Sequence, residues 1–198
     1  MSDIKNIEQH YSLDERPFLE KVRGFCQLVD DRYSPYLTDF LNPREIQIVE
    51  ELAHYYNLKF FVSSTLESEE YGRVILAPEY YELDDDDFEI KRLEISYARQ
   101  FNKLTHPKVL GALINQLGLD RQVFGDIILD EEGRVQFSIA SHLASYAIMT
   151  ITKIGNVSVT LKEVSKDDWI SNQENYSQSF VLLSSMRLDN VLATVLNL

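Results

Sequence analysis

Histidine and cysteine are the side chains that most often bind metals or act as nucleophiles, and this sequence spaces them for neither role. The four histidines are His10, His54, His106 and His142, and they form no HxH or HExxH motif. The single cysteine, Cys26, can complete neither a zinc cluster nor an intramolecular disulfide. No GxSxG, P-loop or GxGxxG motif occurs. We therefore predict no catalytic residue, no metal and no cofactor.

A run of four aspartates, Asp84 to Asp87, is the strongest concentration of possible metal ligands. A calcium loop of the EF-hand type needs a glycine at its sixth position and a glutamate at its twelfth. Counted from Asp84, those positions hold Glu89 and Ile95. The run is therefore predicted to be a solvated connection between two domains.

The charge distribution limits which part of the chain could contact nucleic acid. The net charge is −13, which argues against broad non-specific affinity for phosphate. Residues 1–100 hold 11 basic and 22 acidic residues, whereas residues 101–170 hold 7 and 8. Any RNA contact is therefore expected in the second half. The chain shows neither a signal-peptide pattern nor a long apolar run, so we expect a cytoplasmic protein without membrane contact.

The elements of the first half predict a small α+β domain over residues 1–82. Apolar residues at helical spacing predict a helix over 13–31, with Cys26 beside its buried stripe. Residues 33–43 contain two prolines and are predicted to form a loop. Asn42 followed by Pro43 is typical of a helix start, here of a helix to about residue 56. Short apolar runs at 59–62 and 74–76 predict two strands.

Residues 86–165 alternate strands and helices in the order β-α-β-β-α-β. The predicted strands lie at 93–97, 127–129, 135–139 and 157–161, and the predicted helices span 106–117 and 141–155. This order is that of the ferredoxin-like α-β plait, with both helices on one sheet face and the other face open or covered by the neighbouring domain. The predicted fold class is therefore α+β.

Many RNA-binding modules share this plan, but so do many enzymes. The third predicted strand, GRVQFSIA, does not match the aromatic RNP1 pattern of an RRM. Any RNA binding by this domain is therefore expected to differ from that of a standard RRM. The mostly polar residues 166–186 are predicted to be a linker, in which Trp169 packs on the preceding domain.

Arg187, Leu188 and Asp189 allow two interpretations. The triplet resembles that of pseudouridine synthases, whose aspartate is the nucleophile, and this would make the protein an RNA-modifying enzyme. Those enzymes continue with a Thr/Ser-Gly turn, whereas Asn190 to Ala193 continue a helical pattern here. The triplet also resembles the opening of an S4 RNA-binding domain. By that resemblance residues 187–198 form its first helix, and the chain stops before the rest of the domain.

The whole chain resembles the YlmH family of bacterial S4-domain proteins. The stretches that carry the resemblance are YLTDFLNPREIQIV (36–49), APEYYELDDDDFEI (77–90), HPKVLGALINQLGLDRQVFGDIIL (106–129) and SSMRLDNVL (184–192). The resemblance implies a family-specific first domain, an RNA-binding α-β plait and an S4 domain.

The function implied by the resemblance is that of a non-enzymatic factor in ribosome-associated quality control. It would bind the large ribosomal subunit carrying a stalled peptidyl-tRNA, with rRNA and/or tRNA as partners and no small-molecule substrate. Family gene neighbourhood also suggests a protein-interaction role in cell division, for which the acidic first domain would be the candidate surface.

The candidate RNA contacts are basic residues of the second half. They are Lys103, Lys108, Arg121, Arg134 and Lys153 in the plait, and Arg187 at the S4 opening. Arg121 is the leading candidate because it lies in a loop within the longest family-like stretch. Each of the five plait residues has the alternative of being an ordinary solubilising surface charge, and usual surface composition favours that alternative for any single one of them.

Overall fold

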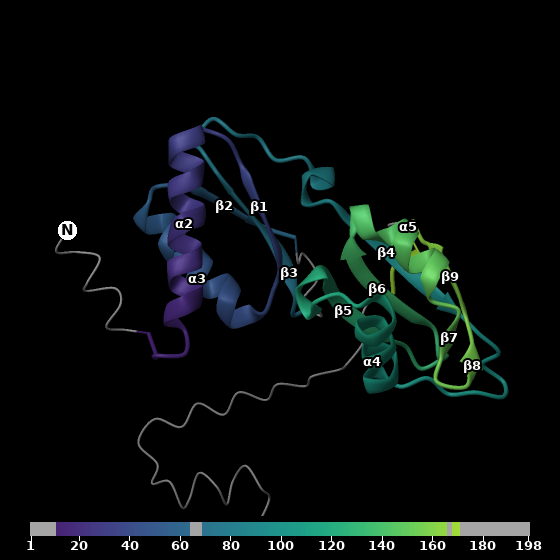
Figure 1. Cartoon of the computed structure of the whole chain (residues 1–198). Coiled ribbons are helices and arrows are strands. Elements are labelled where there is room, and N and C mark those ends of the chain that lie inside the picture. The colour runs from purple at the N-terminus through teal and green to yellow at the C-terminus, as the bar shows by residue number, and fades with distance from the viewer. Residues whose placement is uncertain (1–10, 64–68, 166–167, 171–198) are drawn as a thin grey trace, which may run out of the picture.

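The computed structural model describes residues 11–63, 69–165 and 168–170, and it contains two α+β units that lie side by side (Figure 1). Each unit is a layer of two helices on one antiparallel sheet. The predicted α+β fold class is confirmed. None of the described helices is long and apolar enough to cross a membrane.

The first unit packs two helices on a three-stranded sheet. Its elements are α2 (Arg16–Arg32), β1 (Tyr36–Leu41), α3 (Pro43–Tyr55), β2 (Lys59–Val62) and β3 (Gly72–Ala77). The strand order is β1-β3-β2, and both pairings are antiparallel. Val22, Cys26 and Val49 are completely buried between the helices and the sheet, so Cys26 belongs to the core as predicted. Asn42 begins α3 with a full capping box with Glu45.

The prediction of a loop over residues 33–43 is wrong, because residues 36–41 form β1. Pro35 and Pro43 stand just outside the strand, so neither removes a ladder hydrogen bond from it. The pairing of β1 with β3 is irregular between Leu37 and Phe40. This irregularity interrupts the alternation of polar and apolar residues by which a strand is recognised. The first unit therefore has three strands where two were predicted.

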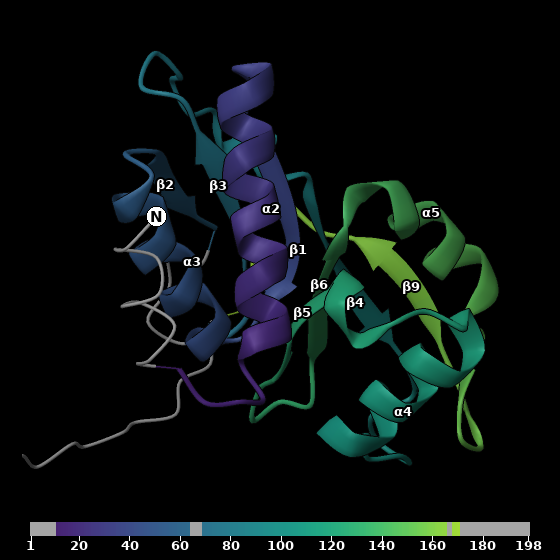
Figure 2. The same ribbon diagram turned by 60° about the vertical axis from the view of Figure 1, so that its left-hand side comes forward.

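The second unit has the predicted ferredoxin-like order. Its main elements are β4 (Ile90–Ser96), α4 (His106–Leu117), β5 (Phe124–Leu129), β6 (Val135–Ala140), α5 (Ser141–Thr150) and β9 (Thr160–Glu163). The strand order is β5-β6-β4-β9. Leu93, Val109 and Phe137 are fully buried between the sheet and the two helices. Figure 2 shows α4 and α5 on the side of this sheet that faces away from the first unit.

The helix predicted to reach Gly155 ends earlier, at Thr150. Residues 153–158 form a separate small hairpin of β7 (Lys153–Ile154) and β8 (Val157–Ser158). Gly155 occupies the turn of this hairpin with φ of +59°, a conformation that favours glycine. The glycine thus marks a hairpin turn and not a helix end.

The aspartate run forms a short capped turn between the units. Asp85–Phe88 is a 3-10 helix (η1), and the carboxylate of Asp84 accepts a hydrogen bond from the backbone N–H of Asp86. Among the described residues no group of three or more histidine, cysteine or acidic side chains is arranged to hold a metal ion.

The first unit covers the sheet face of the second unit that the helices leave free. The ring of Phe40 lies against Gly125, where an added Cβ would be 2.8 Å from the phenyl Cε1. The backbone N–H of Tyr71 donates to a carboxylate oxygen of Asp126 over 2.9 Å. Burial raises the pKa of Asp126. These contacts come from β1 and the residue just before β3 on one side and from β5 on the other.

Candidate nucleic-acid interface

The sheet face that an RRM uses to stack bases is closed in this protein. Arg92, Gln136 and Ser138 project from it and are buried. Residues 168–170 lie across it, since the N–H of Ile170 donates to Oε1 of Gln136 over 3.0 Å and Nε2 of Gln136 donates to the carbonyl of Asp168 over 3.0 Å. RNA binding at this face is therefore sterically blocked.

Trp169 completes this closure. The guanidinium of Arg92 lies 4.0 Å from the centre of the Trp169 ring, a close cation–π contact. Arg92 also forms an ion pair with Glu69 of the first unit, and burial lowers the pKa of this guanidinium. The prediction that Trp169 packs on the preceding domain is confirmed.

The helical side of the second unit, unlike its closed sheet face, is built from stretches that contain basic residues and no acidic ones. Residues 97–119 contain three basic residues and no acidic one, and residues 141–162 contain two basic residues and no acidic one. Such acid-free stretches are unusual in a chain with 32 acidic residues. The two stretches include α4, α5 and the β7–β8 hairpin. They provide a surface where phosphate would meet no carboxylate of the same element.

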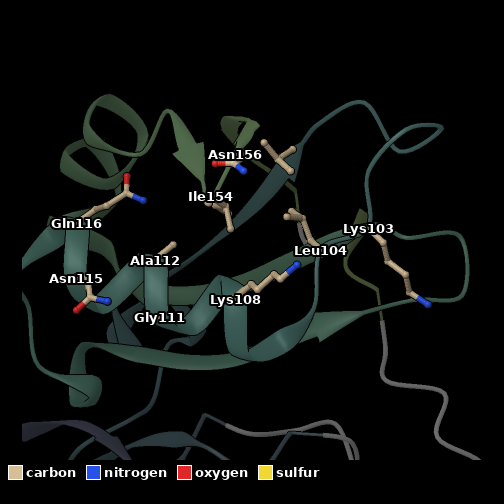
Figure 3. A pocket seen from close by; sticks show the side chains of 11 residues that line it. Lys103, Leu104, Lys108, Gly111, Ala112, Asn115, Gln116, Ile154 and Asn156 are labelled. Carbon is tan, nitrogen blue, oxygen red and sulfur yellow. The ribbon is translucent and has the colours of Figure 1, made fainter.

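A hollow of about 520 Å³ lies between α4 and the β7–β8 hairpin, and we refer to it as the α4–hairpin groove (Figure 3). Its lining residues come from the β4–α4 loop, α4 and the hairpin, and none is acidic. They are Lys103, Leu104, Lys108, Gly111, Ala112, Asn115, Gln116, Ile154, Gly155, Asn156 and Val157. Figure 3 shows Asn115 and Gln116 at one end of the lining, Lys108 near its middle and Lys103 at the other end, with the Lys103 side chain directed away from the others.

The sequence of α4 explains why the groove is open. Lys108, Gly111, Ala112 and Asn115 are spaced i, i+3, i+4 and i+7, so they share one side of the helix. The two central residues are small, and nothing lies within 4 Å of a Cβ built on Gly111. Long polar side chains therefore flank an empty centre.

The wall opposite α4 is held in place by polar and apolar contacts. Nε2 of Gln116 donates to the carbonyl of Lys153 over 2.7 Å, which joins α4 to β7. Ile154 is buried in the core of the second unit. The two facing walls, α4 and the β7–β8 hairpin, are thus fixed to each other, and the β4–α4 loop adds Lys103 and Leu104 to the lining.

The structure places two of the predicted RNA contacts, Lys103 and Lys108, on the lining of the groove. Lys153 is not a lining residue, although it immediately precedes the wall residue Ile154 in β7. All three side chains are exposed, and within the part of the chain that the structure describes none of them forms an ion pair. Their ammonium groups are therefore available to an anion.

The other predicted contacts lie elsewhere. The Arg121 guanidinium lies 4.1 Å from the centre of the Tyr71 ring and donates to the Phe124 carbonyl, so it is engaged between the two units. Nε of Arg134 lies 2.6 Å from a carboxylate oxygen of Asp130 on its own hairpin. Arg187 and the S4-like helix 187–198, like Asp189, lie outside the described residues.

The amide side chains of the groove were not predicted from the sequence. Asn115, Gln116 and Asn156 offer donors and acceptors that suit phosphate and ribose oxygens. The two acid-free stretches could have indicated this surface, but a charge count over seventy residues averaged them with the acidic β5–β6 hairpin.

Comparison with known proteins matches both units. A family model described as "Putative RNA-binding domain in YlmH" matches residues 84–168, which include the groove. The chain is 32% identical over 192 residues to "Ribosome-associated protein quality control protein P2" of Bacillus subtilis (strain 168), covering 97% of this chain and 74% of that protein. A solved structure, "Cell division protein ylmH from Streptococcus pneumoniae", matches with a TM-score of 0.72 and 40% identity, over 82% of this chain and 98% of that one.

Proposed function

The chain belongs to the YlmH family, and from this premise we propose that it is a ribosome-associated RNA-binding protein whose second unit holds an RNA backbone in the α4–hairpin groove. The observation that carries the proposal is a groove lined by Lys103 and Lys108, with no acidic residue among its described lining residues and with the exposed Lys153 on the adjoining strand; none of the three lysines forms an ion pair among the residues that the structure describes. Lysine ammonium groups supply most of the affinity for phosphate, and their binding is independent of base sequence.

The amides of Asn115 and Asn156 complement the lysines. An amide can donate to a phosphate oxygen and accept from a ribose hydroxyl, which is the group that distinguishes RNA from DNA. Because α4 and the hairpin are fixed by the Gln116–Lys153 hydrogen bond, these groups need little reorganisation on binding.

The name of the relative in Bacillus subtilis supports a finer proposal. We propose that the protein acts in ribosome-associated quality control, on the large subunit carrying a stalled peptidyl-tRNA, and that rRNA and/or tRNA is its ligand. The proposed role is non-enzymatic, since it requires only binding. In this proposal Arg187 and the S4-like segment contribute a second RNA-binding site. The proposed place of action is the cytoplasm.

Co-sedimentation with purified ribosomal subunits tests this proposal. The full chain is expected to pellet with large subunits at low salt and less with small subunits. The triple variant K103A/K108A/K153A is expected to lose most of this binding. The variant K91A is a matched control, because Nζ of Lys91 is only 2.6 Å from the Glu163 carboxylate and is already neutralised. Failure of the unchanged chain to pellet at low salt would overturn the proposal.

A further inference from the structure

An aromatic side chain stands exposed in the loop that leads into the groove. Phe101 is 85% exposed, the largest exposure among the large hydrophobic residues that the structure describes. It lies in the β4–α4 loop, residues 97–105, two positions before Lys103. Burial of a phenyl ring is favourable, so this arrangement leaves that free energy available to a ligand.

The loop holds this ring in a defined turn. The N–H of Phe101 donates to the carbonyl of Ala98 over 3.2 Å, and Nδ2 of Asn102 donates to the same carbonyl over 3.2 Å. The hydroxyl of Tyr97 donates to the carbonyl of Gly133 and fixes one end of the loop, while buried Leu104 fixes the other. The exposure of Phe101 is thus a feature of an ordered turn.

The neighbours of Phe101 indicate what kind of ligand suits it. Arg99, Gln100, Asn102 and Lys103 surround it in sequence, and all are polar or basic. A surface for a protein partner would be a contiguous apolar patch with several exposed hydrophobic residues. A single aromatic ring between cationic side chains is instead the combination found where single-stranded nucleic acid binds.

We propose that Phe101 stacks on an unpaired base of the RNA whose backbone occupies the α4–hairpin groove. The ligand class is then RNA with a single-stranded or looped nucleotide, because bases inside a continuous duplex are already stacked and offer no free face. The usual stacking surface of such a fold is closed by Trp169 and the first unit, so the stacking ring is carried by a loop on the other side. This inference rests on the proposed function.

Binding of two labelled RNA probes by the full chain tests the inference. One probe is a short single-stranded oligoadenylate, and the other is an RNA duplex of the same length. Loss of one stacked base weakens single-strand binding by about 5- to 100-fold, and this is the loss expected for Phe101→Ala. Binding of the duplex should not change. Phe101→Tyr keeps a stacking ring and should keep the affinity for the single strand.

The control is Met149→Ala, which removes a side chain that is 75% exposed on α5 and should leave both probes unaffected. A second readout is the tryptophan fluorescence of the Phe101→Trp variant. Oligoadenylate should quench the emission of the added tryptophan, and the emission of Trp169 in the unchanged chain gives the background. Because Phe101 is exposed, all these variants should melt as the unchanged chain does.

The outcomes separate this inference from the proposed function. If Phe101→Ala binds both probes as the unchanged chain does while Lys108→Ala binds them more weakly, the groove binds RNA and the stacking role is refuted. Equal weakening of both probes by Phe101→Ala would also refute stacking. If the unchanged chain binds neither probe at low salt, the groove is not an RNA site and both proposals fail.

Discussion

Replacing Lys108 by alanine removes an exposed ammonium group that lines the groove while leaving the fold intact. Lys108 is exposed and lies in the first turn of α4, where a positive charge opposes the helix dipole. Alanine is also the best helix former. The substitution should therefore stabilise the free protein by about 0.3–1 kcal/mol, whereas it should weaken RNA binding. A substitution that raises the stability of the free protein but lowers its affinity for RNA identifies a side chain whose role is in binding and not in folding.

The size of the binding loss follows from counterion release. Each phosphate neutralised on a single strand contributes about 0.7 to the slope of log affinity against log salt, which near 0.1 M salt amounts to about 5-fold in affinity. Lys108→Ala should therefore bind about 5-fold more weakly, with a slope smaller by about 0.7. If the three lysines act independently, the triple variant should lose about 100-fold, with a slope smaller by about 2.

Fluorescence anisotropy with a labelled single-stranded RNA, repeated between about 0.05 M and 0.2 M salt, measures both quantities. Lys91→Ala changes the net charge by the same amount but removes an ammonium already paired with Glu163, so it controls for the total charge. The reasoning is wrong if the salt slope of Lys108→Ala equals that of the unchanged chain, or if Lys91→Ala lowers it equally.

Further predictions concern stability and reactivity. Gly111→Ala should raise the free energy of unfolding by about 0.5–1 kcal/mol, since the new methyl meets open space; a lower melting temperature would show that the groove is not empty there. Burial raises the pKa of the Cys26 thiol to about 11, so a thiol reagent at pH 8 should react with it only after unfolding, and rapid labelling of the native chain would contradict the packing of α2. The hydrogen bond from Arg44 lowers the pKa of Glu15 from 4.5 to about 2. The ionised carboxylate therefore stabilises the fold at pH values above 4.5, and this stabilisation is lost as the pH falls from 4.5 towards 2. Acid unfolding of Glu15→Gln, followed by circular dichroism, should therefore be less steep over that range, and an unchanged curve would refute the pairing.

The parts of the fold that were predictable depend on short-range signals. Asn42 and Pro43 define the start of α3 because a cap acts within three residues. The second sheet was predictable since each of its strands alternates regularly and each helix has one apolar side. The strand at residues 36–41 was missed because the irregularity between Leu37 and Phe40 depends on its pairing with β3, more than thirty residues away.

The basic residues of the candidate site could be predicted from the sequence, whereas their arrangement in space could not. Lys103, Lys108 and Lys153 could be named from the sequence, but that Lys103 and Lys108 line a groove whose other wall follows Lys153 depends on the packing of the hairpin against α4. Arg121 was the leading candidate in the sequence. It is engaged with Tyr71, a residue fifty positions earlier in the other unit, and this contact follows only from how the two units pack.

The packing of the units also explains how a chain with a net charge of −13 can attract phosphate. Most of the negative charge belongs to the first hundred residues, and the first unit lies on the sheet face of the second. The β7–β8 hairpin is at the end of the second unit remote from the first (Figure 1), and α4 alone is about 10 Å across. Charges separated by more than a Debye length, about 8 Å at physiological salt, are largely screened from one another in solvent. The field at the groove is therefore dominated by Lys103 and Lys108, which line it, and the total charge of the chain is a poor guide to what binds there.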